Sequence, residues 1–155
     1  MPPAVLLPSQ ANELIQFVNV EAKPGYVAGG NDGANDLTIA YLQATQSRAT
    51  WVGFLNASNE IRGALCGMRG KQPQSVYLAY FGVGQGIGLQ AIRAQRDAIC
   101  AFLFDLIPDN WTVDVWAHNN AVIAHEFLSV TFQVAVPIAD GTAYYATSQH
   151  LKAVT

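Results

Sequence analysis

Charged side chains are scarce in this sequence. They make up 12% of its 155 residues, about half the share of roughly 25% in ordinary soluble domains. Hydrophobic residues make up 51%, which argues against a disordered chain. We expect a surface so poor in charge either to be covered by partner subunits or to take its polarity from Gln, Asn, Ser and Thr. The length predicts a single domain over residues 1–155.

Basic stripes and cysteine frameworks are lacking as well. The net charge is −3 and no run of Lys or Arg stands out, so the sequence predicts no nucleic-acid partner. The two cysteines, Cys66 and Cys100, lie in apolar segments far apart, which favours two reduced, buried thiols. The three histidines form no ligand cluster with them, and we predict no metal site.

Long apolar runs and a basic leader are also missing. No stretch is apolar enough to span a membrane, and the first residues carry no positive region ahead of a long apolar run. We therefore expect a cytoplasmic protein, or one built into an assembly such as a virion, with an oligomer as a further possibility.

Periodicity predicts an alternation of short strands and helices. In the first half we expect a strand over 4–7, a helix capped by Ser9, a second helix from Asn35 or Asp36 to about Gln46, and strands over 50–55, 61–68 and 75–81. In the second half we expect a long helix after Gly88, a strand over 111–117, a short helix capped by Asn119 or Asn120, and strands over 132–138 and 143–147. This order indicates an α+β fold with a mostly antiparallel sheet.

A glycine cluster joins a predicted strand to the long helix. Its residues are Gly82, Val83, Gly84, Gln85, Gly86, Ile87 and Gly88. Without Cβ atoms, such a backbone can approach a ligand and expose its N–H groups at a helix N-terminus, where negative charge is favoured. The cluster suits a pyrophosphate, although a tight turn without a ligand explains the glycines equally well. No Gly-Lys-Ser/Thr follows, so it is not a Walker loop.

The segment 75–147 resembles the core of the GNAT superfamily of acyl-CoA N-acyltransferases. In that family an Arg/Gln-x-x-Gly-x-Gly/Ala motif opens the third helix, and its backbone holds the pyrophosphate of acetyl-CoA. Gly86 and Gly88 match the two small positions, and Gly84, Gln85 and Ile87 fit between and before them. The first motif position falls on Val83, so one side-chain contact of the family is missing.

A second match covers residues 111–132. The family has a fifth strand, an Asn, and a short helix that ends in Gly-Phe. Asn120 takes the Asn position, where the resemblance implies a contact with the CoA arm, and Phe132 matches the final Phe. Thr131 replaces the glycine. The tyrosine that often protonates the departing CoA thiolate falls on Phe127, which has no proton to give.

The resemblance implies a GNAT-like fold in which the fourth and fifth strands splay around the thioester. His118, just past the fifth strand, is the candidate base, with a surface loop histidine as the alternative. His125 on the following helix is a weaker candidate for the missing acid, and an exposed helix face is the plainer interpretation. Asp114 is conspicuous in an apolar strand, where it either faces solvent or binds an acceptor amine.

Two functions follow as hypotheses. One is an acetyl-CoA-dependent N-acyltransferase that acts on a small-molecule or protein amine. The other is a catalytically inactive GNAT-like structural protein in a larger assembly. Small internal virion proteins of short-tailed phages look like degenerate members of this kind, with a similar strand–Asn–helix region.

Overall fold

The computed structural model describes residues 2–22, 36–84 and 86–155. These residues form a seven-stranded sheet with the strand order β1-β2-β3-β4-β5-β7-β6. The strands are β1 (Ala4–Val5), β2 (Ala49–Leu55), β3 (Ile61–Arg69), β4 (Ser75–Val83), β5 (Thr112–His118), β6 (Val134–Ile138) and β7 (Gly141–Thr147). Neighbouring strands are antiparallel except β4 and β5, which are parallel. The predicted α+β class with a mostly antiparallel sheet is confirmed.

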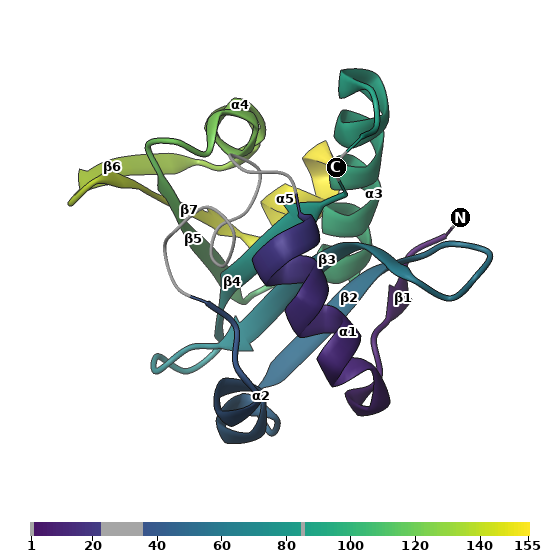
Figure 1. Cartoon of the computed structure of the whole chain (residues 1–155). Coiled ribbons are helices and arrows are strands. Elements are labelled where there is room, and N and C mark those ends of the chain that lie inside the picture. Colours follow the sequence, from purple (N-terminus) through teal and green to yellow (C-terminus); the bar gives the residue numbers. More distant parts are fainter. Residues whose placement is uncertain (1, 23–35, 85) are drawn as a thin grey trace.

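Helices cover both faces of this sheet. They are α1 (Ala11–Gln16), α2 (Ile39–Thr45), α3 (Leu89–Asp105), α4 (Val122–Thr131) and α5 (Ser148–Val154), with a 3-10 turn η1 (Pro8–Gln10) before α1 and a π-helical turn η2 (Phe17–Glu21) after it. Figure 1 shows α1 and α2 on one side of the sheet and α3 and α5 on the other. We call these two sides the α1 face and the α3 face.

Two apolar clusters fill the two faces. On the α3 face, β-strand side chains such as Val113 and Val115 pack with Ile99 of α3 and Phe127 of α4. On the α1 face, Phe17 of η2 packs with side chains of β2, β3 and β4. The alternation predicted for β5 is confirmed, because Val113 and Val115 are buried on the α3 face whereas Asp114 and Trp116 are only partly buried.

Glycines in β3 let α3 lie close to the sheet. A Cβ added at Gly67 would lie 3.2 Å from both terminal methyl groups of Leu103 in α3. A Cβ at Gly63 would lie 2.9 Å from Phe54 and 3.8 Å from Ile99. A side chain at Gly67 would push α3 away, so this glycine sets the distance between α3 and β3, whereas the close contact at Gly63 is with Phe54 of β2.

Two predicted caps in the first half are wrong. Thr38 caps α2, because its Oγ1 accepts a hydrogen bond from the Tyr41 N–H at 3.1 Å. Asp36 precedes this cap, and Asn35 lies outside the described residues. Ser9 lies inside η1, where Gln10 rather than Ser9 accepts a hydrogen bond, from the Leu7 N–H at 2.7 Å.

Two predictions in the second half also need correction. The N-cap of α4 is Ala121, without a side-chain hydrogen bond, and not Asn119 or Asn120. Helix α5 was not predicted at all. Thr147 caps it through a 3.2 Å hydrogen bond from the His150 N–H, and Leu151 is fully buried. One turn of apolar spacing after a β-strand was too short a signal for a helix.

The two cysteines are free and buried, as predicted. Burial raises the pKa of the Cys66 thiol to about 12. Burial also raises the pKa of the Cys100 thiol to about 12. Both side chains therefore behave as small apolar groups of the core.

Two further searches cover only the part of the chain that the structure describes. Within it, no helix combines the length and the apolar character needed to cross a membrane. Within the same ranges, no group of three or more His, Cys, Asp or Glu side chains is placed to hold a metal ion.

We predict that Gly67→Val destabilises the protein by about 1–3 kcal/mol, because the new side chain overpacks the contact between β3 and Leu103. Urea unfolding measures the change. The control is Ala98→Val on the exposed side of α3, which should cost no more than about 0.5 kcal/mol. Equal losses in the two variants would contradict the packing role of Gly67.

Candidate functional site

Strands β4 and β5 pair for only part of their length. Their register runs from Ser75 opposite Thr112 to Leu78 opposite Val115. Beyond this point β4 continues with β3 to Val83 and β5 continues with β7. The carboxyl halves of the two strands therefore separate, and the sheet opens between them.

A β-bulge in β4 accompanies this separation. Cys66 of β3 lies opposite Tyr80, and Gly67 lies opposite Leu78, which leaves Ala79 as an extra residue. The extra residue changes the alternation, so that Leu78 and Phe81, three positions apart, both face α3. A bulge bends its strand, and this one lies where β4 leaves β5. The predicted separation of the fourth and fifth strands is therefore present, and the bulge at Ala79 lies where it begins.

The glycine cluster forms the turn from β4 into α3. Gly86 has a φ of 81°, a conformation that favours glycine. A Cβ at Gly86 or at Gly88 would meet no other atom within 4 Å. Gly84 differs, because its N–H donates a 3.0 Å hydrogen bond to the Arg62 carbonyl oxygen. Gln85 lies outside the described residues.

Helix α3 begins without a side-chain cap. Gly88 is its N-cap residue, and the Ile92 N–H donates to the Gly88 carbonyl oxygen at 3.0 Å. The N–H groups of the first helical turn precede that bond and have no partner within a helix. Together with the open space at Gly86 and Gly88, they form a set of donors suited to an anion.

Arg96 closes the space between α3 and α4. Its side chain is 8% exposed, and its guanidinium carbon lies 4.8 Å from the centre of the Phe127 ring. Its nitrogens bond to Asp97 at 3.0 Å and to the Ile123 carbonyl oxygen at 3.5 Å. The apolar cavity that remains here, lined also by Leu78 and Val115, measures about 30 Å³.

A surface ion pair ties the same two helices together. Arg93 of α3 donates hydrogen bonds of 2.8 and 3.0 Å to the two carboxylate oxygens of Glu126 in α4. Arg96 adds a weaker contact to Glu126 at 3.6 Å. The hydrogen bond from Arg93 holds the pKa of Glu126 below its usual range. The Arg93–Glu126 ion pair therefore crosses the groove between α3 and α4 at its surface, and the Arg96 side chain fills the groove below it.

His118 is the last residue of β5 and not part of the following loop. Its Nδ1 accepts a hydrogen bond from the Asn120 N–H at 3.1 Å, and its ring lies edge-on to Trp116. Nε2 has no hydrogen-bond partner among the described residues, which leaves it available to a ligand. Asn120 itself is exposed, and only its backbone makes hydrogen bonds in the described part of the chain.

His125 lies on the flank of α4 that faces β7, so the expectation of an exposed position is wrong. Its Nε2 lies 2.8 Å from the His118 carbonyl oxygen, and its Nδ1 lies 2.7 Å from the Tyr144 hydroxyl. A carbonyl only accepts, so Nε2 carries the proton and Nδ1 accepts from Tyr144. Both nitrogens thus join α4 to β5 and β7.

Val83 and Phe127, which stand where the GNAT motifs have polar side chains, are both buried. Val83 is fully buried in the cluster of the α3 face, and Phe127 is buried beneath Arg96. Neither reaches solvent, so neither replaces the polar side chain of the family. The burial of Arg96 was not predicted, although its spacing from Ile92 and Ile99 places it on the apolar stripe of α3.

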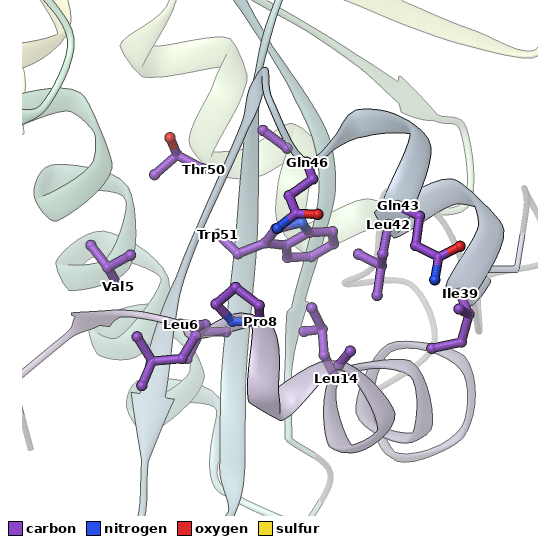
Figure 2. A pocket seen from close by; sticks show the side chains of 13 residues that line it. Val5, Leu6, Pro8, Leu14, Ile39, Leu42, Gln43, Gln46, Thr50 and Trp51 are labelled. Atoms are coloured by element: carbon purple, nitrogen blue, oxygen red, sulfur yellow. The ribbon is translucent and has the colours of Figure 1, made fainter.

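A separate groove lies at the other edge of the sheet. It measures about 400 Å³ and lies between α1, α2 and the strands β1 and β2. Figure 2 shows Trp51 at the centre of the lining, with Leu14, Leu42 and Gln46 among the other side chains that line the groove. Because β3 and β4 separate β2 from β5, this groove is not the opening between β4 and β5.

No protein-family model matches the chain, and no curated protein matches it. Solved structures do. The CoA complex of the GNAT-family N-acetyltransferase YhbS from Escherichia coli superimposes with a TM-score of 0.63 at 11% identity, over 94% of this chain and 80% of that one. The ribosomal-protein-S18-alanine N-acetyltransferase from Escherichia coli gives a TM-score of 0.62 at 13% identity, over 92% and 89%.

A variant of the spermidine N-acetyltransferase SpeG from Vibrio cholerae is similar over 100% of both chains, with a TM-score of 0.62 at 9% identity. At such low identities the similarity establishes the fold and leaves the activity open.

We predict that Arg96 acts mainly through its bulk. Arg96→Ala should lower the unfolding free energy by about 2 kcal/mol or more, because it empties the space over Phe127. Arg96→Met keeps most of the volume and should cost less than about 1.5 kcal/mol. Thermal unfolding of the two variants measures the difference. If Arg96→Met is as harmful as Arg96→Ala, the polar contacts matter more than the packing.

Proposed function

Because the chain has the fold of the GNAT acetyltransferases, we propose that it is an acyl-CoA N-acyltransferase, with acetyl-CoA as donor and an amine as acceptor. The separation of β4 and β5 beyond Leu78 and Val115 carries this proposal. It places an opening in the sheet beside the glycine turn, which is the arrangement that the chemistry needs. An acyl donor bound at the turn could reach the opening from the α3 face.

The residues present fit the pyrophosphate end of the donor. Gly86 and Gly88 leave room for a phosphate, and the first turn of α3 supplies N–H groups and a favourable helix dipole. The Gly84 N–H is not available to the phosphate, because it already donates a hydrogen bond to the Arg62 carbonyl oxygen. The cradle we propose therefore consists of Gly86, Ile87, Gly88 and the first N–H groups of α3, with Gln85 and Asn120 as additional predicted contacts.

The pantetheine end requires a change in the groove between α3 and α4. Ligand sites typically measure roughly 300–1,000 Å³, whereas the cavity beside Arg96 measures about 30 Å³. Binding must therefore displace the Arg96 side chain or move α4. The exposed Arg93–Glu126 pair opposes this motion only weakly, because surface ion pairs contribute about 0–1 kcal/mol.

In the proposed reaction the acceptor nitrogen forms a bond to the thioester carbonyl carbon, and the carbon–sulfur bond breaks. The amine loses one proton and the thiolate gains one. We propose His118 as the base, directly or through water, since its Nε2 has no partner among the described residues. Phe127 cannot supply the proton for the thiolate. His125 could do so only by giving up its bonds to Tyr144 or His118.

An inactive GNAT-like structural protein is the second candidate. The filled space beneath Arg96 and the low charge of the chain favour it. The solved structures described above are acetyltransferases by name, and they give no support to a role in a virion. Binding of acetyl-CoA distinguishes the acyltransferase from the structural protein, because a structural protein has no need of this ligand.

We predict that Gly88→Asp weakens acetyl-CoA binding at least about tenfold and leaves the fold equally or more stable. Asp is favoured over Gly at an N-cap by about a few tenths of a kcal/mol, but its charge would repel the pyrophosphate. Isothermal titration calorimetry measures the affinity, and thermal unfolding measures the stability.

The matched control for this experiment is Gly88→Asn, which caps the helix with a side chain of the same size and no charge. Its affinity should lie between those of the wild type and Gly88→Asp. Lack of acetyl-CoA binding by the wild type at millimolar ligand would refute the proposed function.

We predict that His118→Gln lowers kcat about a hundredfold, the usual contribution of a general base, and leaves the affinity for acetyl-CoA unchanged. Release of free CoA thiol measures turnover. The control is His150→Gln in α5, whose Nε2 contacts the Thr131 carbonyl oxygen away from the opening. Equal activities of His118→Gln and the wild type would remove His118 from the mechanism.

A further inference from the structure

Asp114 lies in the middle of β5 on the α1 face. Its register partners are Tyr77 in β4 and Tyr145 in β7. Register partners on one face of a sheet bring their Cβ atoms within about 5.5 Å. The carboxylate thus lies between two tyrosines, and Trp116 follows it on the same face.

This carboxylate has no polar partner in the part of the chain that the structure describes. No described residue gives it a hydrogen bond or an ion pair, although it is partly buried. Other carboxylates of the chain are paired: Glu126 with Arg93, Asp109 with Lys152, and Glu21 with Arg62. Desolvating a charge without a partner costs stability. Accordingly, burial raises the pKa of Asp114 above its ordinary value.

The direction of this shift defines its effect on stability. A carboxyl whose pKa is higher in the folded state favours folding when it is protonated. Its contribution is present at low pH and is lost as the pH rises through the folded-state pKa. Near neutral pH, Asp114 therefore destabilises the fold relative to an uncharged residue of the same shape. A carboxyl whose pKa is perturbed at such a position is a candidate for a functional residue.

The position of Asp114 relates it to the proposed reaction. Its pairing with Tyr77 immediately precedes the last pair, Leu78 with Val115, after which the strands separate. It lies on the α1 face, whereas the groove between α3 and α4 lies on the opposite face. A group bound at Asp114 would therefore approach the opening from the side opposite the donor.

We propose that Asp114 binds an alkylammonium group of the acceptor, with Tyr77 and Tyr145 as aromatic walls. The acceptor is then a cationic amine and not an amine next to a carboxylate of its own. A carboxylate attracts the ammonium directly, and aromatic faces attract cations within about 6 Å of the ring centre. This assignment rests on the proposed function for its role in catalysis, but the binding itself does not require acetyl-CoA.

Binding of n-butylammonium to the free protein tests the proposal. The reporter is the backbone amide signal of Tyr145, the register partner of Asp114 in β7. We expect millimolar butylammonium to shift this signal in the NMR spectrum. The uncharged analogue 1-butanol and the anion butyrate should shift it at least about tenfold less at equal concentration, because they lack the charge-assisted bond.

The variant Asp114→Asn keeps the shape and removes the charge. It should lose the response to butylammonium while its Tm stays equal or rises, which shows that the protein is folded. The matched control, Asp105→Asn, changes an exposed carboxylate at the end of α3 and should keep the wild-type response. A response that is unchanged in Asp114→Asn, or equal for 1-butanol and butylammonium, or absent in the wild type, overturns the proposal.

Measurements of turnover and of acetyl-CoA binding distinguish a failure of the Asp114 site from a failure of the proposed function. If the chain is an acyltransferase, Asp114→Asn should raise the KM for n-butylamine at least about tenfold, with acetyl-CoA affinity unchanged. If the wild type binds butylammonium but not acetyl-CoA, the ammonium site stands and the acyltransferase function fails. If it acetylates amines with no change in KM on substitution of Asp114, the function stands and the site assignment fails.

Discussion

The parallel pairing of β4 with β5 stops after Leu78 and Val115, and the remaining structure is arranged around that point. Beyond this point β4 stays paired with β3, and β5 stays paired with β7. The bulge at Ala79 bends β4 without breaking its ladder with β3. An opening thus forms inside a sheet whose strands all keep at least one paired edge.

The two faces of this opening differ in chemistry. On the α3 face, Arg96 and Phe127 fill the groove, and the glycine turn offers N–H groups at the start of α3. On the α1 face, Asp114 lies between tyrosines without a counter-ion in the described part of the chain. One face suits an anion and the other a cation, and this polarity fits a reaction between an acyl-CoA and an amine. The structural alternative explains the filled groove but gives no reason to keep a carboxylate at the opening that no described residue pairs with.

Strong periodic signals made most of the fold predictable. The apolar stripe of α3 and the alternation of β5 each extend over enough residues to identify the element, and the glycine cluster indicated where α3 begins. Short elements were less predictable. Helix α5 has one buried leucine, and the caps of α2 and α4 depend on where the chain enters each helix, which local sequence does not determine.

Among the site residues, too, some could be predicted from the sequence and others could not. Glycines 86 and 88 were identifiable from their position between a strand and a helix. The hydrogen bond of Gly84 to Arg62 and those of His125 to Tyr144 and His118 were not, because they join segments far apart in sequence. Arg96 was missed for a different reason: a charged residue on an apolar stripe is ordinarily taken as an exception, and here its aliphatic stem and guanidinium fill the core.

The central claim is that the opening between β4 and β5, with its glycine turn, receives an acyl-CoA. A titration of the isotope-labelled protein with CoA, followed by amide NMR, tests this claim most directly. The account predicts shifts at Gly86, Gly88 and the first turn of α3, together with Arg96 and Phe127 as the groove opens. Shifts confined to the groove around Trp51, or no shifts at millimolar CoA, would contradict it.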